Sequence, residues 1–276
     1  VPKNDEFFSE YSQKDRLRTI SNISGSAGYA VILKNKNILF VDGRYTIQAN
    51  IESGKYFKIE KLEKLLNCKL FKGLTLGIDP KIFTQDQVKK FFLKYNKIKI
   101  IDTNLIDKIF SKYKINSKPF FSLDHKITGE SYKKKITKIS KILKKHKSDY
   151  LFVTAPENVA WLLNIRGYDN PNSPIPNCRL MLTKNKKIFL ISEKFKVIKL
   201  ISEKKIRKNE ILEMENFERL IDKLKSGKIT IDNKTCSIYF NKVLQKKFKI
   251  LSNEDPIYLS KSIKNKNEIK HTINSH

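Results

Sequence analysis

The stretch Ile32-Leu-Lys-Asn-Lys-Asn-Ile-Leu-Phe-Val41 occurs a second time, without a gap, as Leu182-Thr-Lys-Asn-Lys-Lys-Ile-Phe-Leu-Ile191. Each copy has an apolar run, a polar turn of lysine and asparagine, and a second apolar run. This pattern predicts a β-hairpin, because two runs of strand-forming residues flank a short turn. The two copies lie 150 residues apart in a chain of 276 residues, so the sequence predicts one hairpin in each half.

The segments around the two hairpins match in the same order. Upstream, Asn22-Ile-Ser-Gly25 corresponds to Asn164-Ile-Arg-Gly167, and downstream, Thr75-Leu-Gly-Ile-Asp79 corresponds to Lys228-Ile-Thr-Ile-Asp232. Coincidence in a chain rich in lysine, isoleucine and asparagine is the alternative, and three matches in one order argue against it. We therefore predict an internal duplication. The fold class is α/β, with two tandem similar domains, each a mixed sheet flanked by helices.

The length of the chain is typical of about two domains. Lys118-Pro119 marks a change of segment, which divides the chain into residues 1–118 and residues 119–255. Residues 256–276 are predicted to form an extended linker and then a helix from about Asn265. Its apolar positions, Ile269 and Ile273, are too few to hold that helix in place. We expect it to be the start of a truncated further domain.

Other segments carry patterns that predict single elements. Asp42 is expected to cap the helix that follows it, with Tyr45 and Ile47 packing inward. The lysine-rich run 129–147 has isoleucines at helical spacing, so it predicts a long helix whose charges face solvent. The apolar run 197–201 is expected to be a strand.

The composition allows real hydrophobic cores, with 39% hydrophobic residues, 17 Phe and 11 Tyr. The formal net charge of +29 raises the question of nucleic-acid binding. However, only seven of the 57 basic residues are arginine, which leaves 50 lysines spread among isoleucine and asparagine. Arginine is the residue that nucleic-acid sites favour. We interpret the charge as a compositional bias and predict no nucleic-acid partner.

The cysteines and the hydropathy suggest a cytoplasmic protein. Cys68, Cys178 and Cys236 lie far apart without CxxC spacing, which argues against a zinc ribbon and a disulfide framework and fits a reducing compartment. No apolar run approaches the ~18 residues that a membrane span needs. We therefore predict no membrane partner.

No catalytic or metal-binding pattern stands out. The four histidines, at positions 125, 146, 271 and 276, have no metal-ligand spacing, and there is no GxSxG motif. Ser24-Gly-Ser-Ala-Gly28 is not a phosphate-binding motif and is expected to be a tight turn. We predict no catalytic residue, no metal site and no cofactor in these 276 residues.

The segment from Trp161 to Pro176 stands out against the duplication. It contains the sole tryptophan and three prolines, and it is longer than its counterpart, because Gly25 to Val31 spans six positions and Gly167 to Met181 spans fourteen. Insertions at equivalent loops are common places for function. Our candidates for a substrate entrance or a dimer contact are Arg166, Tyr168, Asp169, Asn172 and Pro174. The alternative is a stiff surface connection.

Several of these motifs together resemble one family. They are Ser24–Gly28 with Gly25 and Gly28, then Phe40–Tyr45 with Asp42 and Arg44, then Ala160–Gly167 with Trp161, and finally Pro256-Ile257 with Lys261-Ser-Ile-Lys264. The combination resembles the N-terminal part of Xaa-Pro aminopeptidases of the creatinase/prolidase type, in their three-domain form. The resemblance covers nearly the whole chain.

The resemblance implies a fold and a set of roles. The two domains would be non-catalytic creatinase N-terminal domains that support a homodimer and shape the active-site entrance. A catalytic domain beyond this chain would bind two divalent metal ions, commonly manganese, and would remove the N-terminal residue of peptides with proline at the second position. The chain alone would then be inactive. The remaining alternative is a stand-alone binding module or pseudoenzyme without peptidase activity.

Overall fold

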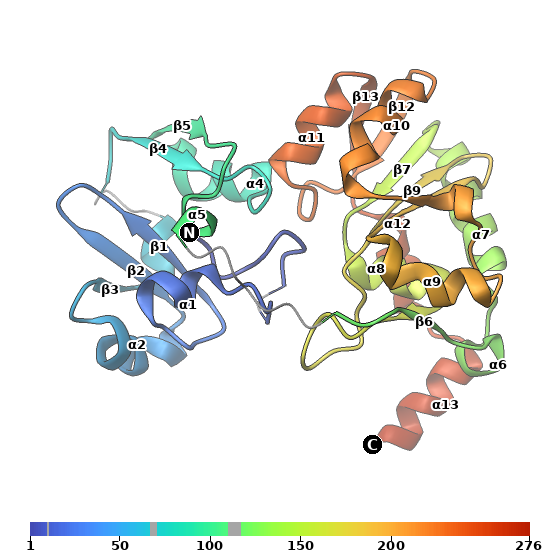
Figure 1. Cartoon of the computed structure of the whole chain (residues 1–276), viewed down its shortest axis with the longest axis horizontal. Coiled ribbons are helices and arrows are strands. Elements are labelled where there is room, and N and C mark those ends of the chain that lie inside the picture. Colours follow the sequence, from blue (N-terminus) through green and yellow to red (C-terminus); the bar gives the residue numbers. More distant parts are fainter. Residues whose placement is uncertain (10, 67–70, 110–116) are drawn as a thin grey trace. The chain divides into compact units, whose positions relative to one another are not determined.

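The computed structural model of the chain describes residues 1–276 except residue 10, residues 67–70 and residues 110–116 (Figure 1). The chain forms two compact units, Val1–Ile115 and Asn116–His276. Each unit is a mixed β-sheet structure with helices, as the hairpin repeat predicts. No helix in the described ranges combines the length and apolar character that a bilayer crossing requires.

The first unit contains a three-stranded sheet in the order β1-β2-β3 and a separate parallel pair, β4-β5. β1 and β2 form the predicted hairpin, and β3 pairs parallel to β2. The strands are β1 (Gly28–Ile32), β2 (Asn37–Val41), β3 (Lys58–Lys61), β4 (Thr75–Ile78) and β5 (Lys97–Ile100). The α-helices are α1 (Arg16–Ser21), α2 (Thr46–Ser53), α3 (Glu63–Leu66), α4 (Gln85–Val88), which continues as a π-helix over Lys89–Leu93, and α5 (Leu105–Ile109).

The first unit packs apolar side chains on both faces of its hairpin. Leu39 and Val41 point to one face, where they join Leu17 of α1 and Ala49 of α2. The ring of Phe40, between them in sequence, points to the other face and meets other aromatic rings there. This alternation follows from the two-residue repeat of a β-strand, and it fixes which face each helix covers.

The second unit has a six-stranded sheet in the order β11-β10-β9-β7-β12-β13. Its strands are β7 (Tyr150–Val153), β9 (Arg179–Thr183), β10 (Ile188–Ile191), β11 (Ile211–Leu212), β12 (Gly227–Ile231) and β13 (Phe248–Ser252), with a small separate pair of β6 (Phe121–Ser122) and β8 (Ile165–Arg166). Its α-helices are α6 (His125–Thr128), α7 (Tyr132–Lys145), α8 (Pro156–Leu163), α9 (Lys194–Ser202), α10 (Phe217–Lys223), α11 (Ile238–Gln245), α12 (Pro256–Ser262) and α13 (Lys266–Ser275).

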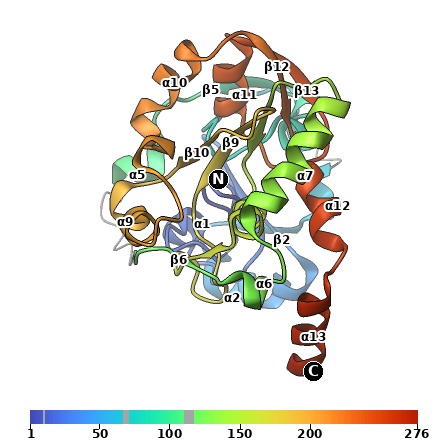
Figure 2. The same ribbon diagram turned by 90° about the vertical axis from the view of Figure 1, so that its right-hand side faces the viewer.

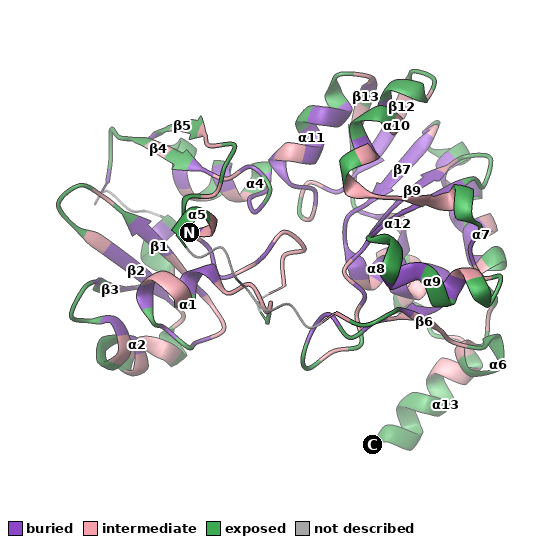
Figure 3. Cartoon of the chain, in the orientation of Figure 1, coloured by how far each residue is buried: buried purple, intermediate pink, exposed green. Residues whose placement is uncertain are grey.

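Helices cover both faces of the six-stranded sheet. Residues from α7, α8, α9 and α12 form one apolar core, and residues from α10 and α11 form the other. Neighbouring residues of β7 alternate between the two cores, with Leu151 in the first and Phe152 in the second. Figure 2 shows α7 and α12 side by side along this unit, and Figure 3 shows that its strands are mostly buried, whereas α13 is largely exposed.

The duplication is visible in the backbone. In both units a hairpin is followed by a strand parallel to its second arm, and then by a parallel pair, β4-β5 or β12-β13. Asn22 and Asn164 both adopt the left-handed conformation and end α1 and α8. Asp79 and Asp232 both accept a hydrogen bond from the backbone nitrogen two residues later. The predicted internal duplication is therefore confirmed.

The two hairpins differ by one residue of register, although their sequences align without a gap. In the first, Val31 faces Ile38, whereas in the second Leu182 faces Ile188. The turn that closes the second hairpin is one residue longer than the turn that closes the first. The extra residue is accommodated at Lys186, whose φ of 71° lies in the left-handed region. Such a residue is typical of a three-residue hairpin loop with a bulge.

Two predicted elements are wrong. The run 197–201 is part of helix α9 and not a strand, because Val197 and Leu200, three residues apart, both face the core. The segment after residue 255 is not an extended linker, since Asp255 caps helix α12 and Ile257 of this helix is completely buried in the core. The helix start follows from the sequence, because Pro256 occupies the first turn directly after the Asp255 cap.

Other expectations are met in part. Asp42 caps a short 3₁₀ turn that leads into α2, but Ile47 is 78% exposed and does not pack. The run 129–147 forms α7 after a separate short helix, α6, which ends at Gly129, but Lys135 of α7 is buried and does not face solvent as predicted. The predicted helix start at Asn265 is confirmed, because its side chain caps α13.

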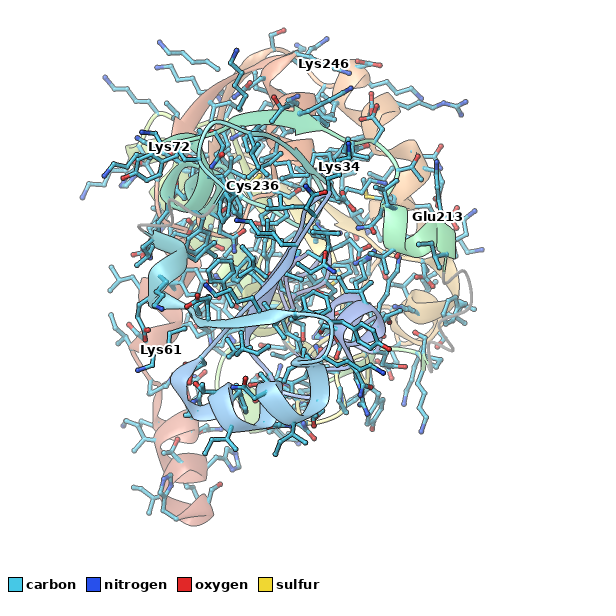
Figure 4. All side chains as sticks on the ribbon, turned by 90° about the vertical axis from the view of Figure 1, so that its left-hand side faces the viewer. Lys34, Lys61, Lys72, Glu213, Cys236 and Lys246 are labelled. Carbon is cyan, nitrogen blue, oxygen red and sulfur yellow. The ribbon has the colours of Figure 1, made fainter. Side chains whose placement is uncertain are left out.

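Lysine ammonium groups lie largely on the outside of each unit. Lys72 and Lys246 are exposed examples, whereas Cys236 is buried (Figure 4). Cys178 is also buried and free, and Cys68 lies outside the described residues. This distribution is expected for a lysine-rich surface over apolar cores.

Candidate functional site

The inserted segment begins where α8 ends. Asn164 terminates the helix in the left-handed conformation, and Ile165–Arg166 then pairs with Phe121–Ser122 as the β8-β6 ladder. At Gly167 the backbone turns, and its nitrogen donates a 3.1 Å hydrogen bond to the oxygen of Pro174. A Cβ atom at Gly167 would lie 2.8 Å from the Cα of Pro176. Only glycine fits here, so the loop closes tightly on its own base.

Asp169 anchors the loop from inside. Its Oδ1 lies 3.1 Å from the ammonium of Lys196 on α9, and both side chains are almost fully buried. The same atom accepts a hydrogen bond from Ser117 Oγ, and Oδ2 accepts one from the backbone nitrogen of Asn177. Lys196 thus connects the loop to α9, and Asp169 is occupied by these contacts.

The outer part of the loop is solvent-exposed. Tyr168 is 53% exposed and packs against the ring of Phe121, at 5.3 Å between centroids. Asn172 and Pro174 are exposed at the tip. The structure therefore separates the five candidate residues: Asp169 lies inside, three lie outside, and Arg166 lines a groove.

This groove, which we call the α8–α13 groove, has a volume of about 470 Å³. Its lining comes from six elements, α6, α7, α8, β8, α12 and α13, and from the loops between them. The lining residues are Leu123, Ile127, Thr128, Lys135, Glu157, Ala160, Trp161, Asn164, Arg166, Ile175, Lys261, Lys264, Glu268, His271 and Thr272. It combines a tryptophan, aliphatic side chains and several charges, which is the usual make-up of a small-ligand site.

Lys135 forms part of the groove wall, although it comes from the buried side of α7 and is 1% exposed. Its ammonium lies 4.0 Å from the centroid of the Trp161 ring and donates to the backbone oxygen of Trp161 and to Asn164 Oδ1. Burial lowers the pKa of Lys135 to about 8. A lysine held over an indole ring is a stabilising cation–π arrangement.

Helix α13 closes the groove through polar contacts at its first turn. Trp161 Nε1 donates a 2.9 Å hydrogen bond to Glu268 Oε1, and the other Glu268 oxygen accepts from the backbone nitrogen of Asn265. Asn265 in turn donates to the backbone oxygen of Thr128, and Asn267 to that of Lys126. No described residue of α13 is buried, so hydrogen bonds and not apolar packing hold it against α6.

A second polar cluster fixes α12 beside the groove. Asn158, which is fully buried, donates to Asp255 Oδ2 at 2.8 Å and accepts from Lys261 Nζ at 2.7 Å. Glu157 accepts a hydrogen bond from the hydroxyl of Tyr258. Burial raises the pKa of Asp255 to about 6. These contacts hold Lys261 at the rim.

Arg166 is half-buried, and burial lowers its pKa. Its Nη1 donates to the backbone oxygens of Ile165 at 2.9 Å and of Ala160 at 3.4 Å. Among the described residues no carboxylate lies within 4.0 Å of Arg166, Lys135, Lys261 or Lys264. The groove therefore carries four cations without a contact ion pair.

The motif residues of the first unit serve its own fold. A Cβ atom at Gly25 would lie 2.8 Å from the Tyr45 ring, and one at Gly28 would lie 3.0 Å from the oxygen of Phe40. Arg44 is exposed and pairs with Asp42 at 2.8 Å. These four residues support a tight turn and a helix start.

The groove contains residues that sequence reasoning missed. Trp161 and Arg166 were candidate residues and Lys261 belonged to a family motif, but Lys135 and the role of Glu268 were not identified. The sequence carried one usable signal: Asn265 followed three residues later by Glu268 is a capping-box pattern. The part of the chain that the structure describes holds no group of three or more His, Cys, Asp or Glu side chains that could bind a metal.

Comparison with known proteins gives a consistent relationship. The family profile of the creatinase/prolidase N-terminal domain matches residues 111–268. Xaa-Pro aminopeptidase 1 of Dictyostelium discoideum is 31% identical; the match covers all of this chain and 48% of the relative. A probable Xaa-Pro aminopeptidase P of Laccaria bicolor is 33% identical over 69% of this chain and 32% of its own length.

A solved structure extends the comparison to the fold. The X-prolyl aminopeptidase of Caenorhabditis elegans, described as a cytosolic enzyme with a di-nuclear active site, matches all of this chain and 48% of its own chain. The TM-score is 0.86 at 24% identity. This chain thus spans about half the length of the relatives that match it from end to end. The profile covers more than half of its residues, and the chain belongs to the creatinase/prolidase N-terminal domain family.

Proposed function

We propose that this chain forms the non-catalytic N-terminal part of a metal-dependent Xaa-Pro aminopeptidase, an enzyme that removes the N-terminal residue preceding proline. The observation that carries the proposal is the match of the whole chain to about half of an Xaa-Pro aminopeptidase. The proposed domains are residues 1–118 and 119–255, with residues 256–276 leading into the catalytic domain. The helical fold of 256–262 supports a rigid rather than an extended connection.

In this proposal the metal ions bind to the catalytic domain and not to the described residues of this chain. The resemblance implies two divalent ions, with manganese as the candidate, but the described residues offer no ligand set that fits them. We therefore assign no chemical step to this chain. Its proposed contribution is to bind and orient the peptide at the active-site entrance and to support a homodimer in the cytoplasm.

The exposed tip of the inserted loop supports the entrance or dimer role. Gly167 and the buried Asp169–Lys196 pair hold the base, while Asn172 and Pro174 are free to contact another surface. The test removes residues 170–176 from the full-length enzyme and measures turnover of an Xaa-Pro peptide and the oligomeric state. We expect one of the two to be impaired while the unfolding midpoint stays close to that of the parent. Unchanged kinetics with an unchanged oligomer would make the loop a plain surface connection.

A further inference from the structure

The α8–α13 groove carries positive charge on Lys135 and Arg166, and no carboxylate of the described residues lies within ion-pair distance of either. Exposed lysines without partners are ordinary in this chain, but Lys135 is almost fully buried and Arg166 is half-buried. Buried charges in proteins are normally paired, because an isolated charge out of water is costly. The positions of these two side chains point to an anion that is not part of the described residues.

The nearby carboxylates are already engaged. Glu130 acts electrostatically on Lys135, but it pairs with the ammonium of Lys138 at 2.8 Å. Glu268 acts electrostatically on both Lys135 and Arg166, yet one of its oxygens accepts from Trp161 and the other from the backbone of Asn265. Glu157 accepts from the Tyr258 hydroxyl. Neither acid is within 4.0 Å of the arginine, so the guanidinium keeps binding capacity.

Arg166 has donors to offer. Its Nη1 is used by two backbone oxygens, whereas no described atom accepts a hydrogen bond from Nε or Nη2. Two parallel guanidinium donors match the two oxygens of a carboxylate. At the rim, Lys261 and the exposed Lys264 add positive charge to the same groove.

Part of the groove lining is apolar. Leu123, Ile127, Ile175 and the half-buried Trp161 line it together with the cations. A volume of about 470 Å³ admits a small organic molecule but not a folded domain. An anion with an attached apolar group therefore matches both kinds of lining.

We propose that the α8–α13 groove binds an organic carboxylate that carries an apolar group, with Arg166 holding the carboxylate and the aliphatic side chains holding the apolar part. A carboxylate fits better than a phosphate, because Glu157 and Glu268 would repel a second negative charge. The C-terminal residue of a peptide and a free acyl amino acid share this chemistry. Only the peptide source rests on the proposed function; the carboxylate site does not.

The sole tryptophan makes the site directly observable. Trp161 is the only tryptophan of the chain and lines the groove, so its fluorescence reports binding there. The full 276-residue chain is titrated at constant ionic strength with N-acetyl-leucine, its amide, inorganic phosphate, and an Xaa-Pro-Leu tripeptide. We expect saturable emission changes with the acid and the tripeptide. The amide should bind at least about tenfold more weakly, because it lacks the charge that Arg166 pairs with. A tripeptide that binds more tightly than the acid identifies a peptide tail as the source, and equal affinity identifies a free acid.

Three variants test the residues. Arg166→Gln should weaken the binding of N-acetyl-leucine by about tenfold or more. Lys264→Gln should weaken it by only a few-fold, because the charge of an exposed lysine is screened by solvent. Lys270→Gln is the matched control: it is an exposed lysine of α13 that does not line the groove, and it should bind as the parent does. Circular dichroism checks the fold of Arg166→Gln, and Lys264→Gln keeps the test valid if that variant does not fold.

Several results would overturn the proposal. They are no saturable change with the acid, equal affinity for acid and amide, tighter binding of phosphate than of the acid, or the same loss in Lys270→Gln as in Lys264→Gln. Cleavage of Xaa-Pro peptides by the full-length protein is measured separately. Cleavage without groove binding removes only this site, and groove binding without cleavage removes only the proposed function.

Discussion

The ammonium nitrogen of Lys135 lies 4.0 Å from the centre of the Trp161 ring and 3.0 Å from the backbone oxygen of the same residue. One buried lysine on α7 thus contacts both the ring and the backbone of the last turn of α8. Its third contact, with Asn164 Oδ1, reaches the residue that ends the helix. The orientation of Trp161 in the groove therefore depends on a side chain 26 positions earlier in the sequence.

The first prediction concerns the alkaline stability of the protein. Lys135 has a folded pKa of about 8, below the ordinary 10.5, so between these values the unfolded chain binds more protons at this site. The free energy of unfolding should therefore rise with pH across that window, by about 2 kcal/mol from this group. Lys135→Met should lose this rise. Urea unfolding at pH 7.5, 9 and 10.5 measures the free energy of unfolding of the parent and the variant. The same pH dependence in both proteins would show that Lys135 does not have a lowered pKa.

The second prediction has the opposite sign, at acid pH. The buried Asp255 has a folded pKa of about 6 against an ordinary value of 3.8, so the folded state binds more protons here between pH 4 and 6. The free energy of unfolding should fall as pH rises through this window, by about 2 kcal/mol from this group. Asp255→Asn keeps a cap acceptor for Ile257 and should flatten that fall. A fall of the same size in the variant would assign the effect to other groups.

The third prediction uses two glycines as a matched pair. Gly167→Ala places a Cβ 2.8 Å from the backbone of Pro176, which cannot move away easily, whereas Gly43→Ala meets nothing within 4 Å. We expect Gly167→Ala to lower the free energy of unfolding by about 1–3 kcal/mol through overpacking. Gly43→Ala should be neutral or slightly stabilising. Equal effects in thermal or urea unfolding would contradict the close approach at Gly167.

The fourth prediction addresses the buried pair that holds the inserted loop. Asp169→Ala leaves the buried Lys196 with only the exposed Glu193, at 3.8 Å, as an ionic partner, so the free energy of unfolding should fall by about 3 kcal/mol. Lys196→Met in the Asp169→Ala background should recover part of this loss, because the stranded charge is gone. Urea unfolding of the two single variants and the double variant gives the coupling energy. Additive losses would mean that the two side chains do not act as a pair.

The hairpins, the duplication and several helix starts could be predicted because their signals are local. Two apolar runs around a lysine–asparagine turn specify each hairpin, and Thr84 and Asn265 carry complete capping boxes. The one-residue register difference could not be seen, because it depends on a left-handed residue at Lys186 that the gapless alignment hides.

Helix α9 shows why other elements were missed. The run from Lys194 to Ser202 is rich in β-branched residues and charges, and its local pattern allows a strand. The helix is stabilised by tertiary contacts instead: Val197 and Leu200 enter the core, and Lys196 pairs with Asp169. Tertiary packing commonly overrides local preference in this way.

Only some residues of the groove could be predicted from the sequence, for the same reason. Trp161 and Arg166 lie in one motif, but their partners come from distant segments. Glu268, which accepts a hydrogen bond from the ring nitrogen of Trp161, lies 107 positions later in the sequence. Lys135 lies among buried isoleucines of α7, and no local pattern marks it as part of a site. Only the folded chain brings these side chains together.

The proposed function assigns peptide cleavage to a catalytic domain and not to this 276-residue chain. The decisive measurement is release of the first residue from an Xaa-Pro tripeptide, with manganese present, by the product of the complete reading frame and, in parallel, by the 276-residue chain. We expect release by the complete product and none by the chain alone. Release by the 276-residue chain, or no release by a complete product that is folded and loaded with metal, would contradict the proposal, and the second result would favour a stand-alone binding module.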